Sequence, residues 1–175
     1  MIGGAIFDAT QAYRYRLWRQ WSDAPSIGFV MLNPNCADAT INDPTIRRCI
    51  GFAKAWEFGR LEVVNLFAYR AKTPSMLKHV NDPIGAENDL YLSTLNQRVE
   101  KVVLAWGNWG RLDGRDRALL SLLTPQSDLY TLGLTKLGQP KHPLYLRQDS
   151  SLSLFSTSAH MQAPPPSRRG YPQTS

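Results

Sequence analysis

Short apolar segments that end in polar or turn residues recur along the chain. Their length and their β-branched content are typical of buried strands. Upstream of them, residues 13–19 alternate aromatic or aliphatic with basic side chains, which is the period of a half-buried strand. We predict an N-terminal edge strand there, with its arginines facing solvent, followed by four core strands at residues 27–32, 61–67, 101–106 and 128–132.

Helical patterns lie between these segments. Asp43 followed by Pro44 predicts a helix N-terminus, because Asp is a favoured cap and Pro a favoured first residue, and we expect this helix to reach Trp56. Two more helices are predicted over residues 86–98 and 114–123. Strands that alternate with helices indicate an α/β fold. The expected form is a three-layer α/β/α sandwich with a central, mainly parallel four-stranded sheet plus the edge strand.

The chain is long enough for one domain. Its 175 residues are 43% hydrophobic, which suffices for one core, and we assign residues 1–147 to a single α/β domain. Residues 148–175 are rich in Ser and Pro and are predicted to form a flexible tail. The N-terminus does not resemble a signal peptide, and no apolar run reaches the roughly 18 residues of a membrane helix, so we expect a soluble cytoplasmic protein without a membrane partner.

The net charge indicates a class of partner, and the cysteine count excludes two kinds of stabilising site. There are 20 Lys and Arg against 14 Asp and Glu, a net charge of +6, which favours a nucleic acid or nucleotide as partner. The only cysteines, Cys36 and Cys49, are too few for a disulfide scaffold or a four-ligand zinc site. No cofactor motif and no metal motif is present, and the oligomeric state stays open.

The connection after the first core strand is the densest polar stretch. In parallel sheets, ligands bind beyond the carboxyl ends of the strands. A carboxamide there can orient a water or grip a base edge, and helix N–H groups can hold an anion. Turn and cap chemistry would explain the same residues. The candidates in this connection are Asn33, Pro34, Asn35, Asp38, Asp43, Arg47 and Arg48.

Two further strand ends carry candidate binding residues. Asn65 places an amide inside an apolar strand, with Tyr69 and Arg70 just beyond it. Arg70 could hold a phosphate or carboxylate, or simply pair with a surface acid, while Asn65 could simply tie the strand to a loop. Asn108 and Trp109 follow the third core strand, where they fit either a tight turn or an aromatic platform for a base.

His142 is the histidine in the most suggestive setting. It lies between Lys141 and Pro143 in a loop beyond the last core strand, where a ring donor could stabilise a developing negative charge. An exposed loop histidine without a role is the alternative. His79 and His160 have no such setting.

The ordered motifs MLNPNCADATINDPTIRRC, VVNLFAYRAKTP, DPIGAEND, VVLAWGNWG and LGLTKLGQPKHPLYL resemble the bacterial and phage family called domain of unknown function 1643, over residues 10–147. The strand ends also resemble, more remotely, the uracil-DNA glycosylase superfamily, in its mismatch-specific and thymine-DNA branch. Met31-Leu32-Asn33-Pro34 is similar to its Gly-x-Asn-Pro motif and His142-Pro143-Leu144 to its His-Pro-Ser or Asn-Pro-Ser loop. Residues 102–108 are similar to a strand that ends in Trp-Gly-Asn.

The second resemblance implies a hydrolase that releases a base from DNA. Asn33 would position the water, His142 would donate to the departing base, and Leu144 would fill the gap left by a flipped nucleotide. The chain lacks the serine after His-Pro and the acidic water activator of the uracil-specific branch, for which Asp38 or Asp43 would substitute.

Three functions are therefore carried forward. The first is a DNA N-glycosylase-like hydrolase, and the second is a non-catalytic domain that binds a nucleotide or modified base in the same pocket. The third is an interaction module in which the strand at residues 13–19 and the basic pair Arg168 and Arg169 make the contacts.

Overall fold

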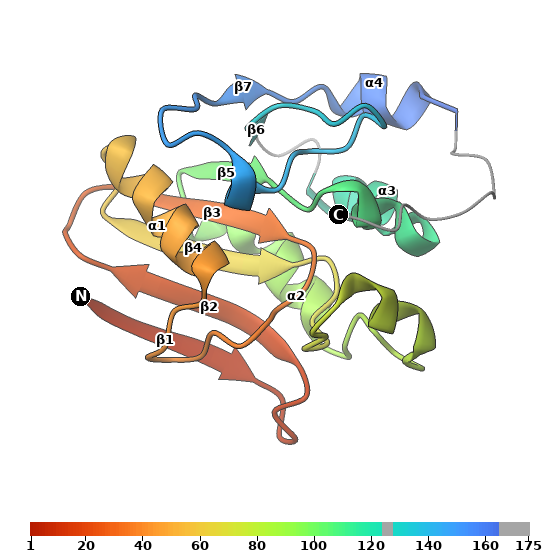
Figure 1. Cartoon of the computed structure of the whole chain (residues 1–175), viewed down its shortest axis with the longest axis horizontal. Coiled ribbons are helices and arrows are strands. Elements are labelled where there is room, and N and C mark those ends of the chain that lie inside the picture. The colour runs from red at the N-terminus through yellow and green to blue at the C-terminus, as the bar shows by residue number, and fades with distance from the viewer. Residues whose placement is uncertain (124–127, 165–175) are drawn as a thin grey trace.

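The computed structural model describes residues 1–123 and 128–164. It is an α/β protein with a seven-stranded mixed sheet, so the predicted class is confirmed (Figure 1). The elements are β1 (Ile2–Phe7), β2 (Arg14–Gln20), β3 (Ser26–Met31), α1 (Pro44–Ala55), β4 (Arg60–Asn65), α2 (Asn88–Ser93), β5 (Lys101–Leu104), α3 (Arg115–Leu123), β6 (Leu129–Thr131), β7 (Ser153–Leu154) and α4 (Thr157–Gln162), with 3-10 turns η1 (Pro74–His79), η2 (Leu95–Gln97), η3 (Asn108–Gly114) and η4 (Pro143–Tyr145).

The sheet is wider than the sequence pattern indicated. Its strand order is β1-β2-β4-β3-β5-β6-β7. β3 pairs in parallel with β4 and β5, and β5 with β6, whereas β1, β2 and β7 are joined by antiparallel pairing. The predicted number of strands, four core strands and one edge strand, is therefore too low. The predicted edge strand, β2, lies inside the sheet between β1 and β4.

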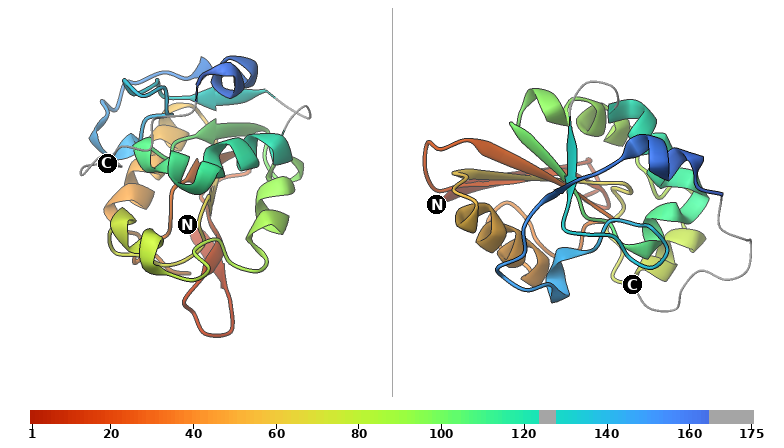
Figure 2. Two further views of the ribbon diagram at one scale, coloured as in Figure 1. Left: turned by 90° about the vertical axis from the view of Figure 1, so that its right-hand side faces the viewer. Right: turned by 90° about the horizontal axis from the view of Figure 1, so that it is seen from above.

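Alternating strand residues divide the core between the two faces of the sheet. On β4, Leu61 and Val63 join a buried cluster with Ile46 of α1, while Val64 joins a second cluster with Leu92 of α2. Figure 2 shows α1 on one side of the sheet and α2 on the other. This period of two decides which polar side chains of a strand meet the same face.

Two of the three predicted helices begin and end close to where the sequence places them. Asp43 caps α1, its Oδ1 accepting from Ile46 N at 2.8 Å, and α3 spans most of residues 114–123. The continuous helix expected over residues 86–98 is wrong, because α2 ends at Ser93 and only the short turn η2 follows. The Thr94 hydroxyl donates to Leu90 O at 2.7 Å, a local bond that competes with helix continuation.

The predicted solvent-facing orientation is wrong for Arg14 and Arg19, which are 2% and 3% exposed, and at Arg14 a β-bulge in β2 is the reason. Ile6 pairs with Arg16 but Phe7 pairs with Arg14, so Tyr15 is an extra residue between them. The bulge shifts the alternation by one residue, which places Arg14 on the α1 face and Arg16 on the α2 face. Arg14 is only 2% exposed rather than facing solvent.

The chain after residue 147 folds back onto the sheet. β7 pairs with β6, and Phe155 N donates to Leu129 O at 2.8 Å. Ser156 caps α4 by accepting from Ala159 N. The composition of residues 148–164 does not reveal these contacts, because they are made with distant parts of the chain. Residues 165–175 of the predicted tail, with Arg168 and Arg169, lie outside the described residues.

None of the helices in the described ranges combines the length and apolarity needed to cross a membrane.

Candidate functional site

A cavity of about 300 Å³ lies where β3 and β4 end. It collects side chains from seven separate stretches of the chain, among them the loop after β3, the last residue of β4 and the loop before η4. Six of the residues singled out from the sequence line it: Asn33, Asn35, Asp43, Asn65, His142 and Leu144.

Asn65 is the most informative side chain of this cavity. It is 1% exposed, and neither Nδ2 nor Oδ1 has a hydrogen-bond partner among the described residues. A buried polar group without a partner costs about 1–3 kcal/mol. Asn65 therefore presents one free donor side and one free acceptor to whatever enters the cavity.

The backbone that carries Asn65 is fixed from the opposite face of the sheet. Asn88 Nδ2 donates to Asn65 O at 2.9 Å and to Leu66 O at 3.1 Å, and Arg115 Nε donates to Leu66 O at 2.8 Å. These bonds satisfy the carbonyls at the end of β4. The main chain at Asn65 is thus held in place without any bond from its side chain.

Asn33 can offer only an acceptor. Its Nδ2 donates to Pro34 O at 2.9 Å and to Ala71 O at 2.8 Å, which uses both amide hydrogens. Oδ1 remains for the cavity, where it can accept from a water or from a ligand N–H.

Asp43 and His142 place a carboxylate and an imidazole at the same cavity. Asp43 gives Oδ1 to the cap of α1, and its Oδ2 accepts no hydrogen bond from the described residues. His142 Nδ1 accepts from Leu144 N at 3.2 Å, so the ring proton is on Nε2. Burial lowers the pKa of His142 to about 4, against the opposing charge of Asp43. At neutral pH His142 is therefore an uncharged donor.

Arg14 also lines the cavity, and the sequence reasoning missed this role. Its Nη1 donates to Ala37 O at 2.9 Å, while Nε is buried and has no partner among the described residues. Burial lowers its pKa to about 10, so the guanidinium stays charged at neutral pH. Other lining residues not singled out from the sequence include Thr45, Lys72, Trp106 and Tyr145.

The remaining predicted residues do not line this cavity, and several support it instead. Asp38 closes its loop, its Oδ1 accepting from Thr40 N at 2.8 Å and Ile41 N at 2.7 Å. Arg48 holds the His142 loop through Pro143 O at 3.4 Å. The predicted residues outside the lining are Pro34, Asp38, Arg47, Arg48, Tyr69, Arg70, Asn108, Trp109 and Lys141.

The pair after β5 fits the turn interpretation better than the platform. Trp109 is buried in the core cluster on the α2 face, so its ring is not an open stacking surface. Asn108 Oδ1 accepts from the Thr135 hydroxyl at 2.6 Å, which ties two loops together.

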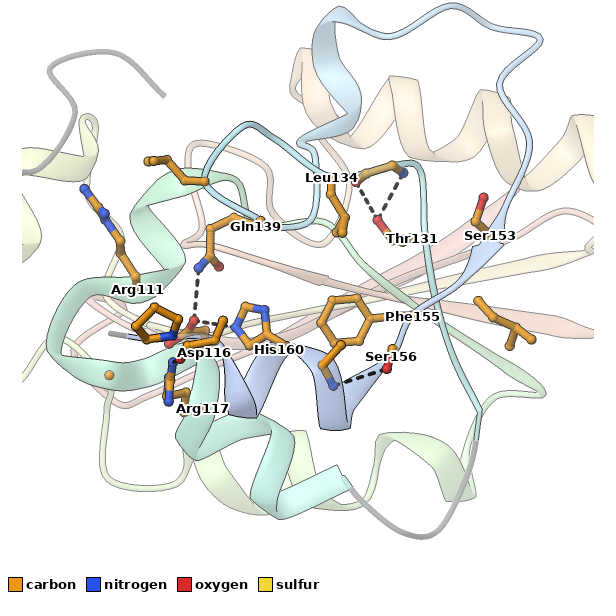
Figure 3. A pocket seen from close by; sticks show the side chains of 18 of the residues that line it. Arg111, Asp116, Arg117, Thr131, Leu134, Gln139, Ser153, Phe155, Ser156 and His160 are labelled. Atoms are coloured by element: carbon orange, nitrogen blue, oxygen red, sulfur yellow. Dashed lines mark hydrogen bonds and ion pairs between the residues drawn. The ribbon is translucent and has the colours of Figure 1, made fainter. Parts of the chain in front are cut away.

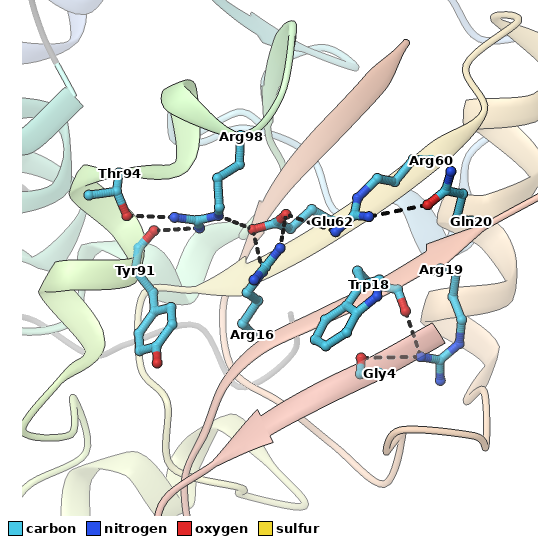
Figure 4. Close-up of polar contacts among 10 residues, drawn as sticks. All are labelled: Gly4, Arg16, Trp18, Arg19, Gln20, Arg60, Glu62, Tyr91, Thr94 and Arg98. Atoms are coloured by element: carbon cyan, nitrogen blue, oxygen red, sulfur yellow. Dashed lines mark hydrogen bonds and ion pairs between the residues drawn. The ribbon is translucent and has the colours of Figure 1, made fainter. Parts of the chain in front are cut away.

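A second polar cluster lies on the other face of β2 and β4 (Figure 4). Glu62 is fully buried, and Arg16 grips it with Nε at 2.9 Å and Nη2 at 3.0 Å. Arg98 Nε donates to the same carboxylate at 2.5 Å, and Arg60 lies 3.9 Å from it. Every carboxylate oxygen here has a protein partner, which indicates a structural role.

A larger cavity of about 1180 Å³ lies under β7 and α4 (Figure 3). On its wall, Asp116 Oδ2 accepts from Gln139 Nε2 at 3.1 Å and pairs with His160 Nε2 at 2.8 Å. Burial raises the pKa of Asp116, but the bonds from His160 and Gln139 outweigh it and the pKa lies below its ordinary value. Gln139 Oε1 also accepts from Trp106 Nε1 at 2.8 Å, so this network reaches the wall of the smaller cavity.

The pairing of His160 with Asp116 was not predictable from neighbouring residues, because the two lie 44 positions apart. Within the described parts of the chain, no three His, Cys, Asp or Glu side chains gather as a metal site would need.

The model of a family described as "protein of unknown function" (DUF1643) matches residues 14–144. The chain belongs to this family. The match begins at Arg14 and ends at Leu144, two residues that line the smaller cavity, so the family's shared region contains the whole lining except Tyr145.

Neither a curated protein nor a solved structure matches the chain. The likeness to the uracil-DNA glycosylase superfamily has no support from these comparisons and stays a prediction.

Proposed function

We propose that the smaller cavity binds a nucleobase and that the protein hydrolyses the N-glycosidic bond of that base. The observation that carries this proposal is the amide of Asn65, a buried residue of the cavity lining whose two polar atoms have no hydrogen-bond partner among the described residues. A carboxamide can bind the polar edge of a base through one donated and one accepted hydrogen bond.

The size and chemistry of the cavity support a base rather than a whole nucleic-acid segment. A volume of about 300 Å³ lies at the small end of ligand pockets, so the cavity would admit one base or one nucleotide unit and no longer stretch of a strand. An enzyme of this kind would take the base out of the stack. Leu144 at the rim is the side chain that would occupy the space left behind.

The other polar groups have the roles that hydrolysis requires. A water held by Asn33 Oδ1 would attack C1′ and give its proton to Asp43 Oδ2 as the new C–O bond forms. The C1′–N bond would break with its electron pair passing to the base. His142 Nε2–H would donate to the base oxygen on which negative charge develops, and as a neutral donor it keeps its proton.

The test is incubation of the purified protein with labelled DNA that carries uracil, hypoxanthine, mismatched thymine or hydroxymethyluracil, scored for abasic sites and for bound fraction. Asn65→Ala and Asn33→Ala are compared with Asn81→Ala, an exposed asparagine outside the cavity. We expect abasic sites with wild type and Asn81→Ala, and a loss of about 100-fold or more with the two cavity variants.

Retention of a modified base that depends on Asn65, without abasic sites, would contradict hydrolysis and leave a non-catalytic base-binding domain. Retention that is indifferent to Asn65 would contradict the pocket as the base site.

A further inference from the structure

We propose that Arg14 forms an oxyanion subsite in the smaller cavity, and that the ligand is a nucleobase compound carrying a negatively charged group, either a carboxylate on the ring or a phosphate. This inference rests on the proposed function, because it takes Asn65 to bind the base. Arg14 would be a second residue that binds the ligand, and the ligand would have to carry a negative charge.

The free side of the Arg14 guanidinium is the one that grips carboxylates elsewhere in this protein. Arg16 holds Glu62 through Nε and Nη2, and Arg147 holds Asp149 through the same two nitrogens, both at 3.0 Å. Arg14 uses only Nη1, on Ala37 O. Its Nε lacks a partner, and no described residue accepts from Nη2. This edge can bind two oxygens of an anion side by side.

The charge of Arg14 is not neutralised by contact. No carboxylate of the described residues lies within ion-pair distance of it, whereas Arg16 and Arg115 each have one. Burying a charged group without a counter-ion is unfavourable, and an incoming anion would remove that penalty.

The surroundings of Arg14 are also net positive. Asp43 is the nearby acid, and its charge raises the pKa of Arg14, while Arg19 and Arg70 act in the opposite direction. Lys72 adds a further cation to the lining of the same cavity. Arg14 and Lys72 against Asp43 leave the charged lining of the cavity net positive, which favours an anionic ligand over a neutral one.

Calorimetry with three probes tests the proposal: uracil, 5-carboxyuracil and uridine 5′-monophosphate. Wild type is compared with Arg14→Met, Arg14→Lys and Asn65→Leu, with Arg16→Lys as the control for a lost arginine on the opposite face. Circular dichroism establishes that each variant is folded, and Arg14→Lys keeps the charge if Arg14→Met does not fold.

We expect wild type and Arg16→Lys to bind one charged probe about tenfold or more tightly than uracil. That preference should vanish in Arg14→Met and weaken in Arg14→Lys, which loses the two-nitrogen edge. Asn65→Leu should weaken all three probes. A preference for 5-carboxyuracil indicates a ring carboxylate, and a preference for the monophosphate indicates a phosphate.

Equal affinity of wild type for charged and neutral probes would overturn the subsite while leaving the base site intact. Arg14-dependent binding of the charged probes that is indifferent to Asn65 would keep an anion site and overturn the proposed function. Failure of wild type to bind any of the three would overturn the inference.

Discussion

Arg14 and Arg16 lie two residues apart on β2, but their environments differ sharply. Arg16 meets a buried carboxylate that two other arginines share, and all of these groups have partners. Arg14 enters a cavity in which its own Nε and both amide atoms of Asn65 have none among the described residues. The same two strands, β2 and β4, thus supply a polar cluster that is complete by itself and one that a ligand would complete.

The two clusters differ in whether their buried polar atoms have hydrogen-bond partners. Buried polar groups in native proteins are nearly always paired, so unpaired ones need an explanation. In the Glu62 cluster the polar atoms stabilise the fold. In the smaller cavity they lower stability in the absence of a ligand, which is typical of binding sites.

The largest expected effect comes from removing the centre of the complete cluster. Glu62→Gln leaves three arginines near one another without a counter-charge, and we expect the free energy of unfolding to fall by about 3 kcal/mol. Urea denaturation measures it, with the exposed Glu87→Gln as control. A change no larger than in the control would mean that the cluster adds nothing to stability.

Two buried asparagines give the next contrast. Asn88→Leu leaves the Asn65 and Leu66 carbonyls with fewer partners and should lower the free energy of unfolding by about 2 kcal/mol. Asn65→Leu removes two unpaired atoms and should raise it by about 1 kcal/mol. Both are read from urea denaturation, and a loss in both variants would contradict the view that Asn65 is reserved for a ligand.

The two arginines provide a smaller version of the same test. Arg16→Met should lower the free energy of unfolding by about 2 kcal/mol, because it removes a two-bond grip on a buried carboxylate. Arg14→Met should stay within about 1 kcal/mol of wild type, since the lost bond to Ala37 is offset by removal of an unneutralised charge. Thermal unfolding shows which of the two variants loses more stability. Equal losses would contradict the proposed difference between the two arginines.

The smallest effect is the change in stability per pH unit that His142 contributes. Burial depresses the pKa of His142 in the folded state, so the unfolded chain binds more protons at mildly acid pH. The stabilisation by neutral His142 is present above about pH 6.5 and is lost as the pH falls toward 4, with a slope below about 1.4 kcal/mol per pH unit. Denaturation at several pH values should show a shallower dependence for His142→Gln than for wild type, and identical dependences would contradict a depressed pKa.

Local chemistry made some features predictable. Asp43-Pro44 marks the start of α1 because capping depends on neighbouring residues. Asn33, Asn65 and His142 were singled out because they follow or end strands, and the structure places all three in one cavity. Their convergence follows from parallel strands that end at the same edge of the sheet.

Features that depend on distant pairing were not predictable. The role of Arg14 depends on a bulge that only the pairing of β1 with β2 creates. Likewise, β7 and α4 are held by Leu129 and Asp116, which no composition rule connects to a Ser-rich segment. Both the burial of Arg14 and the docking of β7 and α4 depend on contacts between residues far apart in the sequence.

The extra residue in β2 also leaves a spacing pattern by which Arg14 can be recognised in related sequences. With the bulge, an arginine three positions before a core leucine, Arg14 before Leu17, shares the leucine's face, whereas an even spacing would be needed in a regular strand. Deleting Tyr15 would leave every cavity residue type in the chain and yet move the guanidinium to the Glu62 side. A relative that lacks this one position would therefore lack Arg14 as a lining residue of the smaller cavity, whatever its percentage identity.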